Sequence, residues 1–262
     1  MRNKHIAMWS CSRSLSTVTT RAFEQLNECL VLDSPFYTPY LIVTNSELPE
    51  KQEVLANLEN EPNRIINQIT GELPQGKSFS FQRHIAKTVL PQFDRYWLEL
   101  MQHFFLIRHP KKIIASYYKA MQKYPGKQNF TIEDIGLKAL NDIFQDIQTI
   151  TGKTPLVIDA DDIAQNPSQV LKFLCKYFEI DFSDKMLTWK QPGLQNSELL
   201  KSNLSYSSEL WEKTWYSTIS KSQGFLPYQA IEVDLTKEIL PMLEESLPIY
   251  EKITTNKKVL KF

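Results

Sequence analysis

Short apolar runs alternate with amphipathic stretches along this chain, which is the pattern expected for repeated strand–helix units. Strands that alternate with helices usually pair in parallel and are covered by helices on both faces. We therefore expect an α/β fold, a three-layer sandwich with a central parallel sheet of about five strands flanked by helices. The runs that predict these strands are His5–Trp9, Leu30–Leu32, Ser78–Phe81, Phe104–Ile107 and Leu156–Ile158.

Two helices can be placed within this pattern. The first follows strand one, and one of its faces carries Val18, Ala22, Leu26 and Cys29. The second begins at Pro167 with Asn166 as its cap. Residues 45–76 and 185–225 lack the alternation, are polar and contain turn residues. We expect both segments to lie over the carboxyl ends of the strands, where open α/β sheets bind ligands.

The composition fits a single domain, residues 1–262, with a substantial apolar core, because 42% of the residues are hydrophobic. Lys and Arg number 30, as do Asp and Glu, so no global field favours nucleic acid and any anion site must be local. No apolar run reaches the roughly 18 residues that predict a transmembrane helix. Cys11, Cys29 and Cys175 form no C-x-x-C pair, which is typical of free thiols in a reducing compartment, and we expect a cytoplasmic protein.

The segment Ser10–Thr17 joins the first strand to the first helix and is rich in serine. A strand, a tight turn and a helix N-terminus together form an anion site, because unpaired backbone amides converge there and the helix dipole adds positive charge. Arg13 adds a full charge. An ordinary serine-rich helix cap is the alternative. The Walker A pattern is absent, since no glycine precedes Gly71, which argues against hydrolysis of ATP or GTP.

A second motif lies at the end of the fourth strand. That strand ends at Arg108, Pro110 opens a helix, and Ser116 lies about two turns into it. An arginine at a strand end can bind phosphate through two parallel hydrogen bonds, and a helical serine can add a donor. The alternative is that Arg108 pairs with a carboxylate and Ser116 is a packing residue.

The two motifs together resemble the cytosolic and bacterial sulfotransferases that use 3′-phosphoadenosine 5′-phosphosulfate (PAPS) as donor. That family has an Arg and a Ser eight residues apart in its 3′-phosphate motif, and Arg108 and Ser116 keep this spacing beside Pro110. Its phosphosulfate loop usually reads Lys-Ser-Gly-Thr-Thr. A serine–arginine–serine loop followed by a segment like Asp33–Tyr37 is similar to a divergent bacterial branch.

The resemblance covers residues 4 to 225 and implies a P-loop-like version of the expected fold. It assigns Arg13 to the position of the loop lysine, where it would also act in catalysis, and Leu15 to that of the glycine. It further implies that a late loop closes over the 3′-phosphate and the adenine. The donor-binding residues that it predicts are Arg13, Ser14, Leu15, Ser16, Thr17, Arg108, Ser116, Lys221 and Ser222.

Members of this family carry a histidine general base near the end of the third strand, and the resemblance assigns that role to His84. A histidine without a role in catalysis is the alternative, and His109 is a competitor that we interpret as structural. Aromatic side chains could line the acceptor pocket or belong to the core. As substrate-binding residues we predict Phe36, Tyr37 and Tyr40.

The predicted reaction is in-line transfer of a sulfuryl group from PAPS to a hydroxyl or amine of a small molecule, which leaves 3′-phosphoadenosine 5′-phosphate (PAP). No metal is expected, because the sequence contains no credible ligand cluster. We interpret Asp159–Asp162 as a structural turn. A nucleotide kinase or NTPase with a degenerate P-loop remains an alternative, as does a non-catalytic PAP-binding protein on the same fold.

Overall fold

The structure is a computed structural model. Within the segment 185–225, for which we predicted a position over the strand ends, residues 191–212 lie outside the described residues. The described residues are 3–46, 51–123, 130–190, 213–228, 235–237 and 239–255.

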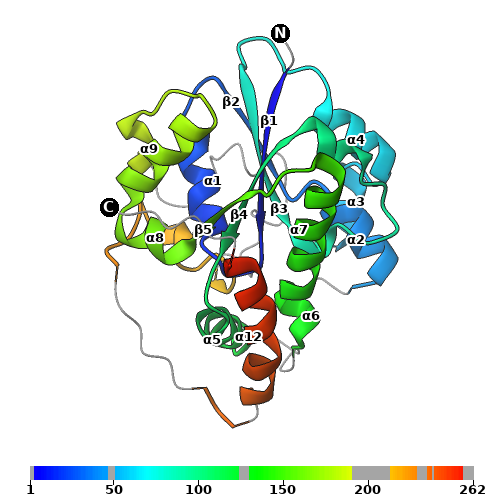
Figure 1. The fold of residues 1–262 in the computed structure, drawn as a ribbon, viewed down its shortest axis with the longest axis vertical. Helices are drawn as coiled ribbons and strands as arrows, with labels where there is room; N and C mark the ends of the chain where they lie inside the picture. Colours follow the sequence, from blue (N-terminus) through cyan, green and yellow to red (C-terminus); the bar gives the residue numbers. More distant parts are fainter. Residues whose placement is uncertain are drawn as a thin grey trace.

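A five-stranded parallel sheet forms the centre of the molecule, which confirms the predicted fold class (Figure 1). The strand order is β2-β3-β1-β4-β5, so β1 is the central strand. Each predicted strand is present, but β3 extends further than its apolar run indicated. The strands are β1 Lys4–Ser10, β2 Cys29–Asp33, β3 Phe79–Ile85, β4 Gln102–Ile107 and β5 Leu156–Asp159.

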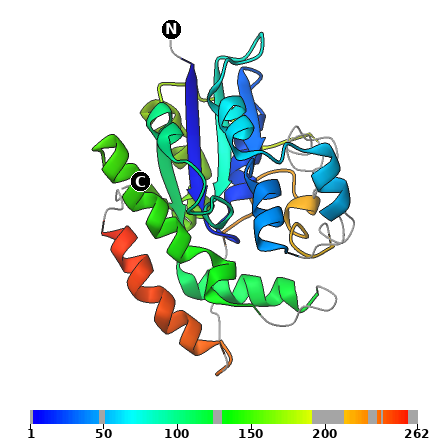
Figure 2. The same ribbon diagram turned by 90° about the vertical axis from the view of Figure 1, so that its right-hand side faces the viewer.

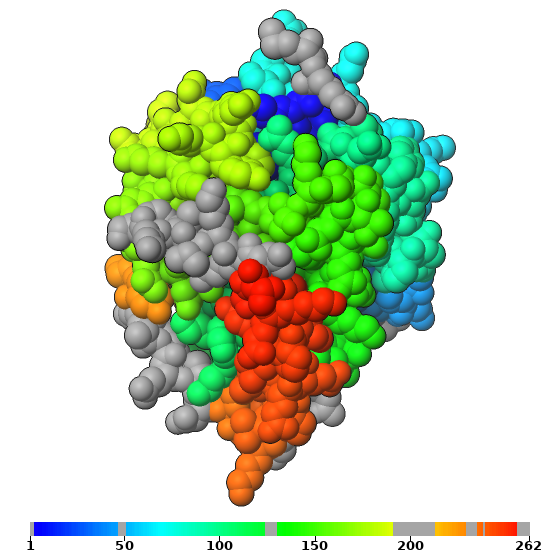
Figure 3. Space-filling model, in the orientation of Figure 1, coloured from blue at the N-terminus to red at the C-terminus, as the bar shows by residue number. Residues whose placement is uncertain are grey.

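Helices cover both faces of the sheet, with α1, α8 and α9 on one face and α4 and α7 on the other (Figures 1 and 2). The last helix, α12, packs against α5 and α7 and covers the lower part of the face seen in Figure 3. The helices are α1 Ser16–Glu24, α2 Tyr37–Thr44, α3 Lys51–Asn57, α4 Pro62–Thr70, α5 Pro110–Met121, α6 Ile132–Ile135, α7 Leu137–Thr151, α8 Ala160–Gln165, α9 Pro167–Tyr177 and α12 Leu240–Thr254. Short 3-10 helices are η1 Ala86–Thr88, η2 Tyr96–Leu100, η3 Asp184–Leu187 and η5 Ile219–Lys221.

Two apolar layers hold the sheet between these helices, because side chains alternate between its two faces. On β1, Ile6 and Met8 join the layer beneath α1 and α9, whereas Ala7 and Trp9 join the layer beneath α4 and α7. All four side chains are fully buried. The sheet is therefore covered on both faces, as its continuous apolar strands predict.

Two local expectations need correction. Helix α1 ends at Glu24, so Cys29 begins β2 instead of lying on the helical face. Asn166 occupies the N-cap position of α9, but its side chain makes no capping hydrogen bond. No helix in the described part of the chain is long and apolar enough to cross a membrane.

The prediction for residues 45–76 is wrong for its second half. Helix α4 packs Ile65, Ile66 and Ile69 into the layer beneath it and ends at Thr70. Asn3 Nδ2 donates to the carbonyl oxygen of Gly71 at 3.1 Å, so this end of α4 lies at the amino ends of the strands. The helix was missed because only three of its nine residues are buried, which leaves a short apolar stripe in a polar segment.

The connections place a crevice at the carboxyl ends of β1 and β4. The chain leaves β1 toward β2 and β3 on one side of the sheet, and then returns to β4 and β5 on the other side. Helix α1 follows β1 on one face, whereas α7 follows β4 on the opposite face. Strand order reverses at this point, which is where open α/β sheets bind their ligands.

Candidate functional site

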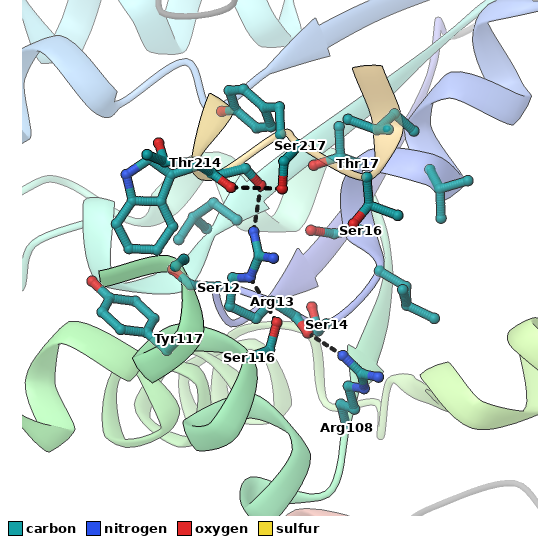
Figure 4. Close-up of a pocket in the computed structure, with 18 of the residues that line it drawn as sticks. Ser12, Arg13, Ser14, Ser16, Thr17, Arg108, Ser116, Tyr117, Thr214 and Ser217 are labelled. Atoms are coloured by element: carbon teal, nitrogen blue, oxygen red, sulfur yellow. Dashed lines mark hydrogen bonds between the residues drawn. The ribbon is translucent and has the colours of Figure 1, made fainter. Parts of the chain in front are cut away.

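A cavity of about 1090 Å³ lies at these strand ends. The loop after β1, the end of β3, one side of α5 and residues 214–228 all contribute to its wall. Of the late segment, residues 214–225 therefore lie over the strand ends, as predicted, whereas residues 185–190 do not line the cavity. Figure 4 shows the centre of the cavity, where Arg13, Arg108 and Ser116 lie close together.

The loop after β1 has an unusual backbone. Arg13 has φ 66° and Leu15 has φ 63°, the left-handed region that side chains with a Cβ rarely adopt. Leu15 is the residue immediately before α1, and the hydroxyl of Ser14 donates to the carbonyl oxygen of Cys11 at 2.8 Å. Left-handed residues in a strand-to-helix turn form the compact type of loop whose amides surround an anion. Leu15 thus has a conformation that a glycine adopts without steric cost, which agrees with the position that the resemblance assigns to it.

Arg13 connects three segments of the chain that line the cavity. Its Nε donates to Ser116 Oγ on α5 at 3.0 Å, and its Nη1 donates to the carbonyl oxygen of Trp215 (Figure 4). The guanidinium carbon lies 5.9 Å from the centre of the Trp215 ring, within the range of a cation–π contact. Ser116 is therefore a polar member of the cavity wall and not a packing residue.

Arg108 lies beside Arg13 at the end of β4. Its Nη1 donates to the carbonyl oxygen of Arg13 at 2.9 Å, whereas its buried Nε has no hydrogen-bond partner among the described residues. Within the same ranges, no carboxylate comes within 4.0 Å of either guanidinium. Burial lowers the pKa of Arg13, and the positive charge of Arg108 lowers it further. Burial also lowers the pKa of Arg108, which the more distant Asp161 and Asp159 partly offset.

Two half-buried cations without close counterions are unfavourable where the protein partly excludes water. An anion between them would remove that cost, and charge-assisted hydrogen bonds from guanidinium groups are among the stronger contacts that a protein can make to one. The cavity is therefore built for a ligand with at least one negatively charged group.

A third arginine, Arg83, was not assigned a role by sequence reasoning. It lies at the end of β3, opposite Asp33 in the register of β2, and its Nη2 donates to Asp33 Oδ2 at 2.9 Å. Its Nη1 donates to Thr17 Oγ1 at 2.8 Å and to Ser16 Oγ at 3.3 Å. Arg83 therefore orients the two hydroxyls at the start of α1. One signal for it was present in the sequence: like Asp33, Arg83 follows an apolar run that predicts a strand.

His84 does not lie in the cavity, which corrects its predicted role as general base. Its side chain is 1% exposed, stacks on Trp9 at 4.6 Å between ring centres, and lies 5.5 Å from the ring of Trp97. Neighbouring residues on a strand face opposite sides of the sheet, so β3 directs Arg83 to the anion loop and His84 to the core. A general base must come within hydrogen-bond reach of the proton that it removes, and His84 is too deeply buried to do so.

Of the remaining predicted residues, some line the cavity and others do not. Tyr37, Tyr40 and Ser222 line the cavity, together with all the residues predicted from the first loop. Phe36 is fully buried and packs 5.4 Å from the ring of Trp97, so it is a core residue. Lys221 is exposed at the end of η5 and does not line the cavity. Neither Phe36 nor Lys221 is therefore placed for its predicted contact.

Two ion pairs that the sequence did not indicate lie at opposite parts of the cavity wall. Lys112 Nζ lies 2.5 Å from Asp161 Oδ2 and 5.7 Å from the centre of the Tyr228 ring. Lys87 Nζ donates to the carbonyl oxygen of Asp134 at 2.9 Å and lies 3.9 Å from its Oδ1. The capping role of Asp159 for α8 agrees with the structural turn expected there. Among the described residues, no group of three His, Cys, Asp or Glu side chains could hold a metal ion.

Comparison with known proteins gives matches over nearly the whole chain. A family model described as a sulfotransferase domain matches residues 4–257. Branched-chain-amino-acid aminotransferase-like protein 2 of Arabidopsis thaliana is 30% identical over 253 residues, which cover 97% of this chain and 42% of that protein. Sulfotransferase ppzF of Metarhizium majus (strain ARSEF 297) is 28% identical over 156 residues, 52% of this chain and 44% of that protein. This chain thus spans less than half the length of these relatives.

Solved structures of sulfotransferases are also similar to this chain. The sulfotransferase from Alicyclobacillus acidocaldarius has a TM-score of 0.48 and 10% identity, and the match covers 98% of this chain and 94% of that one. The sulfotransferase domain from the curacin biosynthetic pathway has a TM-score of 0.46 and 15% identity, with coverage of 94% and 98%.

The left-handed conformation of Leu15 can be tested by two substitutions that both remove its side-chain packing. Leu15→Gly and Leu15→Ala lose the same contacts to first approximation, but only alanine keeps the cost of a Cβ at positive φ. We expect the glycine variant to be more stable than the alanine variant by about 1 kcal/mol, as measured by urea unfolding. Alanine being the more stable of the two would show that this loop is not left-handed at residue 15.

The burial of His84 predicts a pH dependence of stability. Burial, with a smaller effect from His103, lowers the pKa of His84 to about 3, whereas an unfolded histidine titrates near 6.5. Below that value the unfolded chain binds a proton that the folded chain does not, so the free energy of unfolding falls as the pH falls. The loss for one such histidine is at most about 1.4 kcal/mol per pH unit.

Replacing His84 with glutamine removes the group that binds this proton in the unfolded chain. The variant should lose less stability than the wild type between neutral pH and mild acid, whatever its stability at neutral pH. Urea unfolding at a series of pH values gives the two slopes. Parallel slopes would mean that His84 takes up a proton in the folded protein as readily as in the unfolded chain, and that it is not buried as described.

Proposed function

Because the chain belongs to the sulfotransferase family, whose model matches residues 4–257, we propose that it transfers a sulfuryl group from PAPS to a hydroxyl or amine of a small-molecule acceptor. The observation that carries the proposal is the meeting of Arg13, Arg108 and Ser116 in one cavity. Two half-buried guanidinium groups without close counterions suit a donor that carries separate phosphate groups.

The residues fit the two ends of the donor. Arg108, with its unpartnered Nε, would bind the 3′-phosphate through two parallel hydrogen bonds. Ser116 accepts a hydrogen bond from Arg13 and still has its own O–H to donate, so it can contact the same phosphate. Arg13 and the start of α1 would hold the 5′-phosphosulfate end. This arrangement would let the protein distinguish PAPS from nucleotides without a 3′-phosphate.

In the proposed reaction, the bond between sulfur and the bridging oxygen of the donor breaks, and its electron pair remains on the 5′-phosphate. The acceptor oxygen or nitrogen forms the new bond to sulfur and loses a proton. Arg13 and the helix N-terminus at residues 16–17 would stabilise the charge that develops on the bridging oxygen. The contribution of the protein is thus mainly positioning and electrostatic stabilisation, as in phosphoryl transfer.

We also propose a cytoplasmic location for this domain. Cys11, Cys29 and Cys175 are all buried and unpaired. Free thiols persist in reducing compartments, whereas secreted proteins of similar cysteine content usually form disulfides. Cysteine usage therefore supports this location without defining it.

Arg108→Ala tests the proposed donor site. We expect PAP to bind the variant about ten- to a hundredfold more weakly than the wild type, because one charge-assisted phosphate contact is lost. The affinity for AMP, which lacks the 3′-phosphate, should change little. Lysine at this position should restore only part of the affinity, since an ammonium group cannot form two parallel hydrogen bonds. Calorimetric titration of both ligands measures these differences.

Arg64→Ala is the matched control, because Arg64 lies on α4 with an exposed side chain and does not line the cavity. It should bind PAP like the wild type. Equal weakening of AMP and PAP by Arg108→Ala would show that Arg108 does not bind the 3′-phosphate. Tighter binding of magnesium ATP than of PAP would favour the nucleotide-kinase alternative, and PAP binding without any transfer would favour the non-catalytic one.

A further inference from the structure

Transfer to a hydroxyl group requires a destination for the acceptor's proton, and the histidines of this chain do not provide one. All four lie within the described residues, and none lines the cavity. His84 and His103 are buried beside Trp9. His109 accepts a hydrogen bond at the start of α5, and His5 lies near the amino end of β1. The other side chains of the cavity wall are therefore the candidates for the proton acceptor.

Carboxylates are the next candidates, and two of them line the cavity within the described residues, Asp134 and Asp161. Asp161 pairs with Lys112 at 2.5 Å, and its charge raises the pKa of Arg108. It therefore belongs to the part of the cavity that would hold the 3′-phosphate. Asp134 lies beside Lys87, in the part that contains Tyr40 and Tyr117.

The surroundings of Asp134 leave its carboxylate in contact with the cavity. Asp134 is the third residue of α6, and its Oδ2 accepts from the backbone amide of Thr131 at 3.0 Å and from the Thr131 hydroxyl at 3.4 Å. Its Oδ1 lies 3.9 Å from Lys87 Nζ. The side chain is 23% exposed, so an acceptor in the cavity can reach it.

Tyr117 connects Asp134 to the transfer site. The Tyr117 ring packs 4.9 Å from the ring of Trp215, whose carbonyl oxygen holds Arg13 (Figure 4). The negative charge of Asp134 raises the pKa of the Tyr117 phenol beyond the effect of burial, and the positive charge of Arg13 lowers it. Tyr117 thus lies within electrostatic range of both groups. Asp134, Tyr117 and the loop after β1 all line the same cavity, so the carboxylate and this loop belong to one site.

We propose that Asp134 is the general base for this transfer and that the acceptor is a neutral hydroxyl compound bound between Asp134 and Arg13. The proposal rests on the function proposed above. The carboxylate takes the hydroxyl proton while the acceptor oxygen forms its bond to sulfur, and the sulfur–oxygen bond of the donor breaks with its electron pair on the 5′-phosphate. Asp134 then releases the proton to solvent.

The acidity of the acceptor provides the test. Asp134→Asn should be assayed with PAPS and either phenol or 4-nitrophenol, at a mildly alkaline pH where only 4-nitrophenol is already ionised. With phenol we expect kcat to fall on the order of a hundredfold, because the base is gone. With 4-nitrophenol, which has no proton left to remove, kcat should stay close to that of the wild type. Equal losses with both acceptors would overturn the proposal.

Two control variants separate catalysis from the capping of α6. Glu133→Gln changes a neighbouring exposed carboxylate that does not line the cavity, and it should behave like the wild type with both phenols. Thr131→Ala weakens the capping of α6 but leaves the Asp134 carboxylate in place. If Thr131→Ala lowers kcat as much as Asp134→Asn, the role of Asp134 is structural and the proposal fails.

A binding measurement gives the same answer without turnover. In the presence of PAP, Asp134→Asn should bind 4-nitrophenolate more tightly than the wild type does, because a negative charge next to the bound phenolate has been removed. The affinity for PAP itself should not change. An unchanged preference between phenol and 4-nitrophenolate would contradict the proposal, whereas failure of the wild type to bind PAP would contradict the proposed function instead.

Discussion

The proximity of Arg13 and Arg108 is the constraint on which the rest of this site depends. Two guanidinium groups repel one another, and both are partly removed from water at the point where the strand order reverses. The hydrogen bond from Arg108 to the Arg13 carbonyl, together with the Arg13 contact to Ser116, holds them there. The two rigid strands β1 and β4 supply the positions, and the energy stored in the unfavourable charges becomes affinity once an anion binds.

The parts of this arrangement that the sequence revealed are those that depend on local rules. A strand followed by Arg108 and Pro110 defines a strand end and a helix start without any tertiary information. The same holds for the serine-rich loop after β1. Because all five strands were recognised and parallel strands end at one edge, the two motifs could be brought together correctly before the fold was known.

The parts of the site that could not be predicted depend on which face of the sheet or which side of the cavity a side chain points to. The apolar run of the third strand ended at Phe81, but β3 continues to Ile85, and its pairing with β2 determines that Arg83 and not His84 reaches the anion loop. A shift of one residue reverses every such assignment. Asp134 was missed for a related reason, because a short helix far along the chain carries no signal that it borders the cavity.

The hydrogen bond from Arg13 to the Trp215 carbonyl has a consequence for the synthesis of the protein. The two residues are 202 positions apart, so a nascent chain has displayed its anion loop long before the segment that supports it leaves the ribosome. Contacts of such long range form late and slow folding. Until then the Arg13 side chain lacks one of its fixed partners. A nucleotide that binds only the completed cavity would stabilise finished chains and leave truncated ones to the cell's proteases.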